Sequence, residues 1–372
     1  MRLISTFDNW IDIFRTWRDR LGIDKELMAD YQFEHLFGGV HSDEVEFGAF
    51  AGERKWEKVI EIPDQRVRDA LLHLIVYQGD TEFASVEQQQ TLLQTYPNEY
   101  DLKALARIMK EEMRHGWQMS YLLVNYFGTT GKVEAQKLLE RNALNHERLL
   151  NSFNEPIDHW LDFFTYADFI DRDGKFQLKM LSHSGFAPLA RSMPPMLREE
   201  SFHLGTGNNG IRRILMAGKI DPHMVQKYFN KWIPTAYDLF GQSHSSSAHW
   251  SYVWGLKGRY DEERNPHAAD KDQLNEAARQ LYYEEVKALI SRLNKLLPKD
   301  AAPLYAPDVR FNRAIGEFAG KPYSTSGELM DESKYAAYRD TVLPTAADLV
   351  ALKDIWKTND WIIEREPTDA LN

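Results

Sequence analysis

Apolar residues recur at helical spacing through the middle of the chain. The first such segment begins at Asp64, which has the character of a helix N-cap. Apolar residues then follow at Val67, Leu71 and Ile75, on one face of a helix. This pattern predicts a helix over residues 64–94.

A second helix is predicted over residues 101–127. Its apolar stripe includes Leu105 and Ile108, and Gly128 is a suitable residue to end it. Gly79 interrupts the preceding helix, and a glycine inside a helix usually has a packing reason.

Five further segments carry helical patterns: residues 136–154, 156–171, 185–204, 222–237 and 274–297. Pro194-Pro195 falls inside the third of them and is expected to kink or restart it, because proline removes a backbone donor. The first 62 residues are less regular, and a run of short strands is expected within residues 45–62.

These patterns predict a mainly α protein in three parts. The parts are an N-terminal cap (residues 1–63), a helical core (residues 64–297) and a C-terminal extension packed on that core (residues 298–372).

Two short motifs of the form Glu-x-x-His lie in the predicted core. They are Glu112-Met113-Arg114-His115 and Glu200-Ser201-Phe202-His203. Residues three apart share a helix face, so each motif places a carboxylate beside an imidazole. One such tetrapeptide is weak evidence, since a surface Glu near a surface His is the simpler interpretation. Glu112, however, continues the apolar stripe of its helix, and buried polar groups need partners.

The motifs also repeat in a larger order. Glu82 lies one helix before Glu112, and Asp171 lies one helix before Glu200. Ferritin-like carboxylate proteins hold two metal ions with one carboxylate from each of two helices and Glu-x-x-His from each of the other two. Asp171 departs from the usual Glu at its place. The order predicts a ferritin-like four-helix bundle whose metal ligands are Glu82, Glu112, His115, Asp171, Glu200 and His203.

Four carboxylates with two imidazoles suit iron or manganese better than zinc or copper. They also cancel the charge of two divalent ions. The sequence does not distinguish iron from manganese, and we expect two iron ions.

Composition limits the alternatives. The net charge of −11 argues against nonspecific nucleic-acid binding. There is no cysteine in the chain, which excludes disulfides and thiolate-bound metal clusters within it. Electrons would have to come from another protein. No membrane-spanning segment or secretory signal is evident, so a cytoplasmic location is expected.

Several stretches around these residues are distinctive. They are Gln78-Gly79-Asp80-Thr81-Glu82, Ala84-Ser85-Val86-Glu87-Gln88-Gln89, the motif at 111–115, Asp171-Arg172-Asp173-Gly174-Lys175-Phe176-Gln177-Leu178, Pro188-Leu189-Ala190-Arg191, the motif at 199–204 and Gly255-Leu256-Lys257-Gly258-Arg259. In the identity, order and spacing of these residues, the chain resembles the oxygenase component of the benzoyl-CoA epoxidases, and more distantly the catalytic subunit of the phenylacetyl-CoA epoxidases.

The resemblance implies a di-iron monooxygenase. Such an enzyme reduces O₂ and inserts one oxygen atom into the ring of an aryl-CoA thioester as an epoxide, with benzoyl-CoA as the expected substrate. It implies NADPH as the electron source, through a separate flavin/iron–sulfur reductase. Two alternatives stay open: an oxygenase or hydroxylase of another acyl-CoA, such as phenylacetyl-CoA, and a non-catalytic ferritin-like metal-binding protein.

Three residues are weaker candidates for substrate binding. Gln78 lies one turn before Glu82, where it could bond a metal ligand or the thioester carbonyl, or pair with another side chain. Lys257 and Arg259 could bind CoA phosphates, although the pattern favours a solvated basic turn.

Some neighbouring residues have other expected roles. Glu111 and Glu199 each precede a predicted ligand and could support the metal site from outside. Arg114 is expected to pair with a nearby acid. His244 and His249 are expected in a loop.

Overall fold

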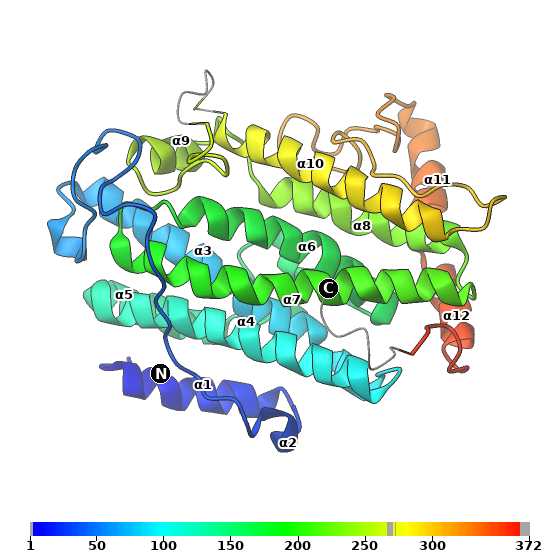
Figure 1. Cartoon of the computed structure of the whole chain (residues 1–372), viewed down its shortest axis with the longest axis horizontal. Helices are drawn as coiled ribbons and strands as arrows, with labels where there is room; N and C mark the ends of the chain where they lie inside the picture. Colours follow the sequence, from blue (N-terminus) through cyan, green and yellow to red (C-terminus); the bar gives the residue numbers. More distant parts are fainter. Residues whose placement is uncertain (1–2, 266–270, 272, 365–372) are drawn as a thin grey trace.

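The computed structural model describes residues 3–265, 271 and 273–364 (Figure 1). Regular structure in these residues is helical, apart from isolated bridges. The α-helices are α1 (Phe7–Arg20), α2 (Lys25–Met28), α3 (Gln65–Gln89), α4 (Glu99–Tyr126), α5 (Gly128–Glu140), α6 (Trp160–Leu181), α7 (Ala187–Ala217), α8 (Pro222–Leu239), α9 (Ser246–Val253), α10 (Leu274–Leu293), α11 (Glu332–Val342) and α12 (Ala346–Ile355).

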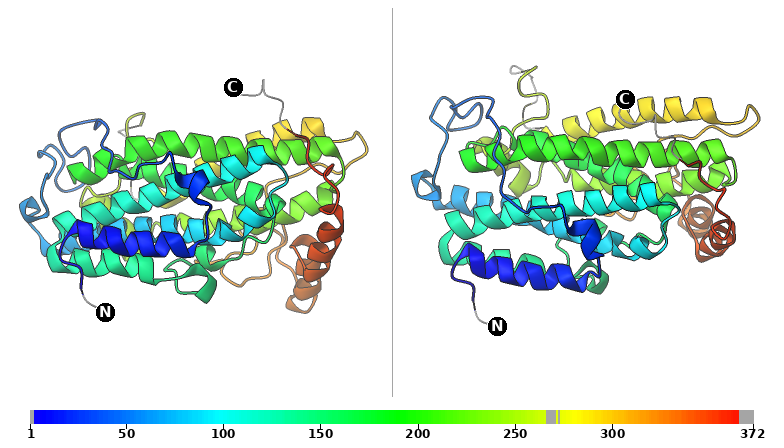
Figure 2. Two further views of the ribbon diagram at one scale, coloured as in Figure 1. Left: turned by 90° about the horizontal axis from the view of Figure 1, so that it is seen from below. Right: turned by 60° about the horizontal axis from the view of Figure 1, so that its bottom comes forward.

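Four long helices form the centre of the molecule. α3 packs on α4 and α6 packs on α7, each pair joined by a short connection, and α4 contacts α7 across the two pairs. α1 and α5 lie together along one side of this bundle, while α8 and α10 cover α6 (Figures 1 and 2). The predicted ferritin-like, mainly α fold is therefore confirmed.

Side chains from all three predicted parts join one hydrophobic cluster, including Trp10, Phe163 and Leu352. The division at residues 63 and 297 stays a prediction. Of the predicted cap and extension, residues 1–2 and 365–372 lie outside the described residues.

The local signals at the helix ends are confirmed. The Asp64 side chain accepts a hydrogen bond from the backbone N–H of Arg66 (2.8 Å) and caps α3. Gly128 follows the end of α4 with a φ of +56°, which L-residues rarely adopt.

Gly79, inside α3, also has the expected packing reason. A β-carbon there would lie 2.8 Å from Leu138 Cδ1 and 3.1 Å from Met119 Cβ, so its absence lets α4 and α5 approach α3.

The strands predicted within residues 45–62 are wrong. Only isolated bridges occur there, including Trp56 with Phe186. Backbone groups of this segment bond to distant parts of the chain instead: Ala49 N–H donates to Val253 C=O at the end of α9 (2.6 Å), and Trp56 N–H to Gly185 C=O between α6 and α7 (2.8 Å). Val45, Phe47, Trp56 and Ile62 are buried without a partner strand, whereas Ile60 is exposed.

The helix predicted over residues 136–154 is also wrong beyond its first turn. α5 ends at Glu140, and only short 3₁₀ turns follow, at Ala143–Asn145 and Asn151–Asn154. The reason is a long-range ion pair. Arg148 is buried, and its guanidinium lies 3.2 Å from Asp80 and 2.8 Å from Glu87, which draws the segment across α3.

Pro194-Pro195 does not restart the third predicted helix. α7 continues through both prolines from Ala187 to Ala217. Pro195 cannot donate to the carbonyl of Arg191, one turn earlier. That carbonyl instead accepts a hydrogen bond from the N–H of Gly38 (2.7 Å). The N-terminal segment thus replaces the bond that the proline removes.

We expect Gly38→Ala to destabilise the protein by about 1–3 kcal/mol, the usual cost of overpacking. A β-carbon at Gly38 would lie 2.9 Å from Pro194 Cβ and 3.3 Å from Pro195 Cδ, whereas one at Gly39 would meet nothing within 4 Å. Denaturant unfolding should therefore separate the two variants, with Gly39→Ala close to wild type. Equal stabilities for Gly38→Ala and wild type would contradict this account.

Candidate metal centre

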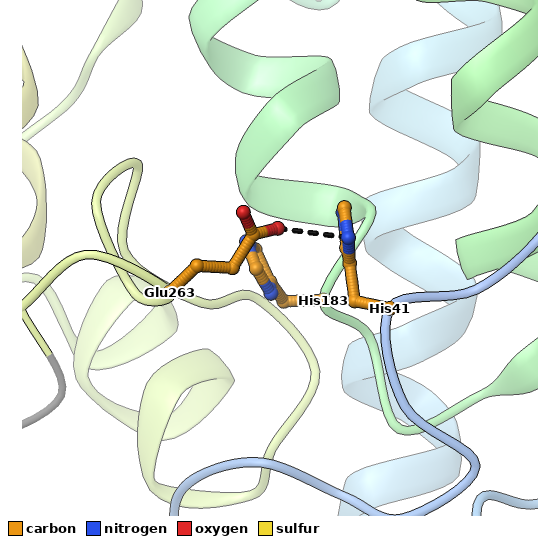
Figure 3. A group of neighbouring side chains, drawn as sticks. All are labelled: His41, His183 and Glu263. Atoms are coloured by element: carbon orange, nitrogen blue, oxygen red, sulfur yellow. Dashed lines mark ion pairs between the residues drawn. The ribbon is translucent and has the colours of Figure 1, made fainter.

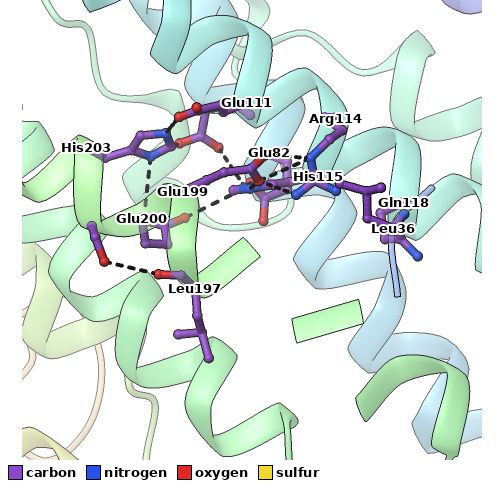
Figure 4. Close-up of polar contacts among 12 residues, drawn as sticks. Leu36, Glu82, Glu111, Arg114, His115, Gln118, Leu197, Glu199, Glu200 and His203 are labelled. Atoms are coloured by element: carbon purple, nitrogen blue, oxygen red, sulfur yellow. Dashed lines mark hydrogen bonds and ion pairs between the residues drawn. The ribbon is translucent and has the colours of Figure 1, made fainter. Parts of the chain in front are cut away.

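The six predicted ligands meet between the four central helices, and Figure 4 shows four of them: Glu82, His115, Glu200 and His203. α3 carries Glu82, α4 carries Glu112 and His115, α6 carries Asp171, and α7 carries Glu200 and His203. All six side chains are buried. The helix pairing therefore brings both halves of the repeated pattern to one place.

The first half is built around His115. Its Nδ1 atom lies 3.1 Å from Glu82 Oε2, 4.0 Å from Glu112 Oε2 and 3.7 Å from Glu200 Oε1. Glu82, Glu112 and His115 offer three ligand atoms within 4.8 Å of one another. This group could hold one metal ion.

The second half is built around His203. Its Nδ1 atom lies 3.3 Å from Glu112 Oε1, 3.6 Å from Glu200 Oε2 and 3.8 Å from Asp171 Oδ2. Glu112 and Glu200 present oxygens to both imidazoles. Glu82 lies beside His115 only, and Asp171 beside His203 only, so a metal pair held here would be shared by Glu112 and Glu200.

The outward nitrogen of each imidazole is held by the opposite motif. His115 Nε2 lies 2.8 Å from Glu199 on α7, and His203 Nε2 lies 3.1 Å from Glu111 on α4. A carboxylate on the far nitrogen fixes the orientation of a metal-binding histidine. Glu111 and Glu199 thus occupy the supporting positions expected from the sequence.

Arginines hold these two supporting carboxylates in turn. Arg114 forms a two-pronged ion pair with Glu199, and Arg107 Nε donates to Glu111 Oε1 (2.8 Å). The predicted pairing of Arg114 with an acid is confirmed.

Unsatisfied atoms show that the centre fits a cation. Asp171 Oδ2, Glu200 Oε2 and His203 Nδ1 are buried without a hydrogen-bond partner. Buried polar atoms are seldom left unpaired. All three face the group of ligand atoms, so a bound metal ion would satisfy them together.

The protonation of the centre is shaped by burial and crowding. Burial and the neighbouring Glu82 raise the pKa of Glu112 well above its usual value. Burial alone would lower the pKa of His115, but Glu82 and Glu199 raise it to about 9. Protons thus offset part of the charge when no metal is bound. Metal binding must displace them, so metal affinity should fall as pH falls.

A cavity of about 760 Å³ leads to the carboxylates. Its inner wall includes Glu82, Glu112, Asp171 and Glu200, and its outer wall includes residues of α3 and α9. The cavity gives a small molecule a route to the candidate metal centre.

Two of the three substrate-binding candidates line this cavity. Gln78 Nε2 donates to Glu82 Oε1 (2.5 Å), which favours its interpretation as a support for a metal ligand. Lys257 is partly buried, and its Nζ donates to Gln177 Oε1 (2.6 Å), so it is not part of a solvated turn. Arg259 does not line the cavity and pairs with Asp261 (2.9 Å).

Two cavity residues were missed by the sequence analysis. Tyr166 lies beside the ligands, and burial together with Asp171 raises its pKa well above the usual value. Burial raises the pKa of Asp173 to about 7. Tyr166 falls within the helix predicted over residues 156–171 and Asp173 beyond its predicted end, whereas α6 continues to Leu181. Only the packing shows that both side chains face the cavity. His244 and His249 are exposed, and His249 lies on α9 rather than in the predicted loop.

A four-helix bundle around buried Glu-x-x-His pairs defines the class of ferritin-like carboxylate proteins. Within that class, residues 58–313 match the family described as phenylacetic acid catabolic protein. The chain belongs to this family.

Two relatives give the resemblance more detail. The chain is 37% identical to benzoyl-CoA oxygenase component B of Aromatoleum evansii, over 93% of this chain and 87% of the relative. It is 22% identical to one of the subunits of 1,2-phenylacetyl-CoA epoxidase from Escherichia coli (strain K12), over 58% of this chain and 61% of the relative. The resemblance predicted from the sequence is therefore confirmed. In the described part of the chain, no helix has both the length and the apolar character needed to cross a membrane.

We expect Glu111→Gln to weaken iron(II) binding about 10- to 100-fold, because the histidine opposite loses the carboxylate that orients it. This variant leaves no buried cation, since the Arg107 side chain is 51% exposed. Competition with a coloured chelator under anaerobic conditions would measure the affinity. Glu284→Gln on α10 is the control, because Glu284 is exposed and pairs at the surface with Lys287. Unchanged affinity in Glu111→Gln would remove Glu111 from the support of the metal centre.

Proposed function

We propose that this protein is a di-iron oxygenase of an aryl-CoA thioester. In the proposed reaction one atom of O₂ is added to the aromatic ring as an epoxide, and the other leaves as water. Benzoyl-CoA is the proposed substrate. The observation that carries the proposal is the cavity whose lining includes four buried carboxylates, in a chain 37% identical to a benzoyl-CoA oxygenase component.

Iron is proposed because of the ligand set. Glu82, Glu112, Asp171 and Glu200 supply four carboxylates, and His115 and His203 supply two imidazoles, a set that suits iron better than zinc or copper. When bound, the iron pair supplies the two-electron reduction of O₂.

The protein's own contribution is to hold the proposed ligands in place. Glu199 and Glu111 fix the two imidazoles from outside (2.8 and 3.1 Å). Gln78 holds Glu82 through a 2.5 Å hydrogen bond. The phenol of Tyr166 keeps its proton because of its raised pKa, so it can donate a hydrogen bond inside the cavity.

Lys257 is proposed to contact the thioester end of the substrate. It faces the cavity, and burial lowers its pKa to about 8. An ammonium group that is partly removed from water gains more from an electronegative partner than one at the surface. A carbonyl oxygen of the substrate would be such a partner. The binding energy of the CoA portion can help orient the ring.

Electrons are proposed to come from NADPH through a separate flavin/iron–sulfur reductase. The chain has no cysteine to hold an iron–sulfur cluster of its own. The name of the relative, a "component B", describes one part of a larger system. A cytoplasmic location accompanies this proposal, since NADPH and CoA thioesters are found there.

Two alternatives differ in what they require. Oxidation of phenylacetyl-CoA would use the same centre, and the distant relative named for that substrate supports it. A non-catalytic metal-binding protein would need no open route to its ligands, and the 760 Å³ cavity favours an enzyme instead.

The first prediction from this proposal is metal content. Anaerobic loading with iron(II), followed by desalting and elemental analysis, should give about two iron ions per chain, as ferritin-like carboxylate sites hold. Glu112→Ala should lose most of this iron while keeping its helical circular-dichroism spectrum, because Glu112 reaches both halves of the centre. If the wild-type protein keeps only about one iron ion per chain as the iron(II) concentration is increased, the paired site would be contradicted.

The second prediction concerns the substrate. Benzoyl-CoA, phenylacetyl-CoA and free benzoate would compete in one assay with iron-loaded protein, NADPH, ¹⁸O₂ and a reductase. Mass spectrometry should show one labelled oxygen in the benzoyl-CoA product and none in benzoate. Retained activity in His203→Ala would contradict the role of the centre.

The outcome also separates the alternatives. Preference for phenylacetyl-CoA would keep the reaction and change the substrate. Oxidation of free benzoate as fast as the thioester would refute the need for CoA.

A further inference from the structure

A second cluster of metal-binding side chains lies apart from the six ligands of the main centre. His41 comes from the N-terminal segment before α3, His183 from just beyond the end of α6, and Glu263 from the segment after α9 (Figure 3). Each offers one ligand atom, and these atoms lie within 4.8 Å of one another. Three stretches distant in sequence thus meet at one point.

The spacing of these atoms is close to that of a tetrahedral metal site. Glu263 Oε1 lies 2.8 Å from His41 Nδ1 and 3.9 Å from His183 Nε2. Bonds of about 2.0–2.2 Å around zinc place neighbouring ligand atoms roughly 3.3 Å apart. The two distances fall on either side of that value, so small side-chain movements would complete the geometry.

His183 supplies independent support for a ligand at this point. Its side chain is 0% exposed, and its Nε2 is buried without a hydrogen-bond partner. A buried ring nitrogen of this kind is rarely left unsatisfied. In Figure 3 the ring lies beside the Glu263 carboxylate, so an ion held by Glu263 would be within its reach.

The other nitrogen of His183 is held as in known metal sites. Its Nδ1 lies 3.3 Å from Glu46 Oε2, and Glu46 forms an ion pair with Lys55 (3.3 Å). Histidine ligands commonly present their second nitrogen to a carboxylate, which fixes the ring and makes the ligating nitrogen more basic.

Lys179 is the group that competes with a metal ion here. Its Nζ lies 2.7 Å from Glu263 Oε1 and 3.3 Å from His41 Nε2. The ammonium neutralises Glu263 while no metal is bound. Lys179 and Glu263 also line a small cavity of about 160 Å³, so the lysine has room to move away.

We propose that His41, His183 and Glu263 bind one divalent transition-metal ion, with water as the fourth ligand. Two imidazoles and one carboxylate match zinc sites that keep one open position. This site differs from the main centre, whose six predicted ligands include four carboxylates. A bound ion would fasten the N-terminal segment and the segment after α9 to the end of α6, independently of the proposed oxygenase activity.

The test is zinc binding to the iron-loaded protein. Zinc is titrated against a coloured chelator, and iron content is measured before and after, so that zinc exchange at the main centre is detected. We expect one zinc ion per chain beyond that exchange in wild type. Glu263→Gln and His41→Ala should each weaken this binding by at least about tenfold. Both side chains are partly exposed, so neither change should prevent folding.

Two further variants sharpen the result. His223→Ala removes an exposed histidine of α8 that belongs to no candidate cluster among the described residues, and it should bind zinc as wild type does. Lys179→Met removes the competing ammonium and should tighten binding. A cluster of ordinary ion pairs would not respond in this way. Equal zinc binding by wild type, Glu263→Gln and His41→Ala would overturn the proposal.

Discussion

The structure depends on one electrostatic constraint: four carboxylates and two imidazoles share a small buried space between four helices. Burial of unpaired charge is costly, so these groups require either protons or metal cations. The pKa values of Glu112, Asp171 and His115 are raised, so these groups hold protons more strongly when no metal is bound. A pair of divalent ions would balance the four carboxylates.

The same constraint explains how the two helix pairs are joined. Glu111 of α4 supports His203 of α7, and Glu199 of α7 supports His115 of α4. Each helix therefore positions the imidazole of the other. Because the exchange is reciprocal, the spacing of α4 and α7 and the orientation of both imidazoles are set together. A shift in the packing of α4 against α7 would therefore move both imidazoles.

The irregular N-terminal segment forms hydrogen bonds with the outside of the helical bundle. Leu36 N–H donates to Gln118 on α4 (2.7 Å), and Gly38 N–H donates to the Arg191 carbonyl exposed by the prolines of α7. A few residues later, His41 reaches the end of α6 through Ser182 (3.2 Å). This one segment thus contacts three of the four central helices: α4, α7 and the end of α6.

The sequence by itself determined the features that depend on near neighbours. Glu-x-x-His places two ligands on one helix face, Asp64 caps α3, and the glycine after Phe127 ends α4, because each effect acts within about one helical turn. Tertiary structure decided the rest. Arg148 ends the predicted helix early by reaching Asp80 and Glu87, and Lys257 faces the cavity instead of solvent. These outcomes depend on residues far apart along the chain, whose meeting is fixed only when the helices pack.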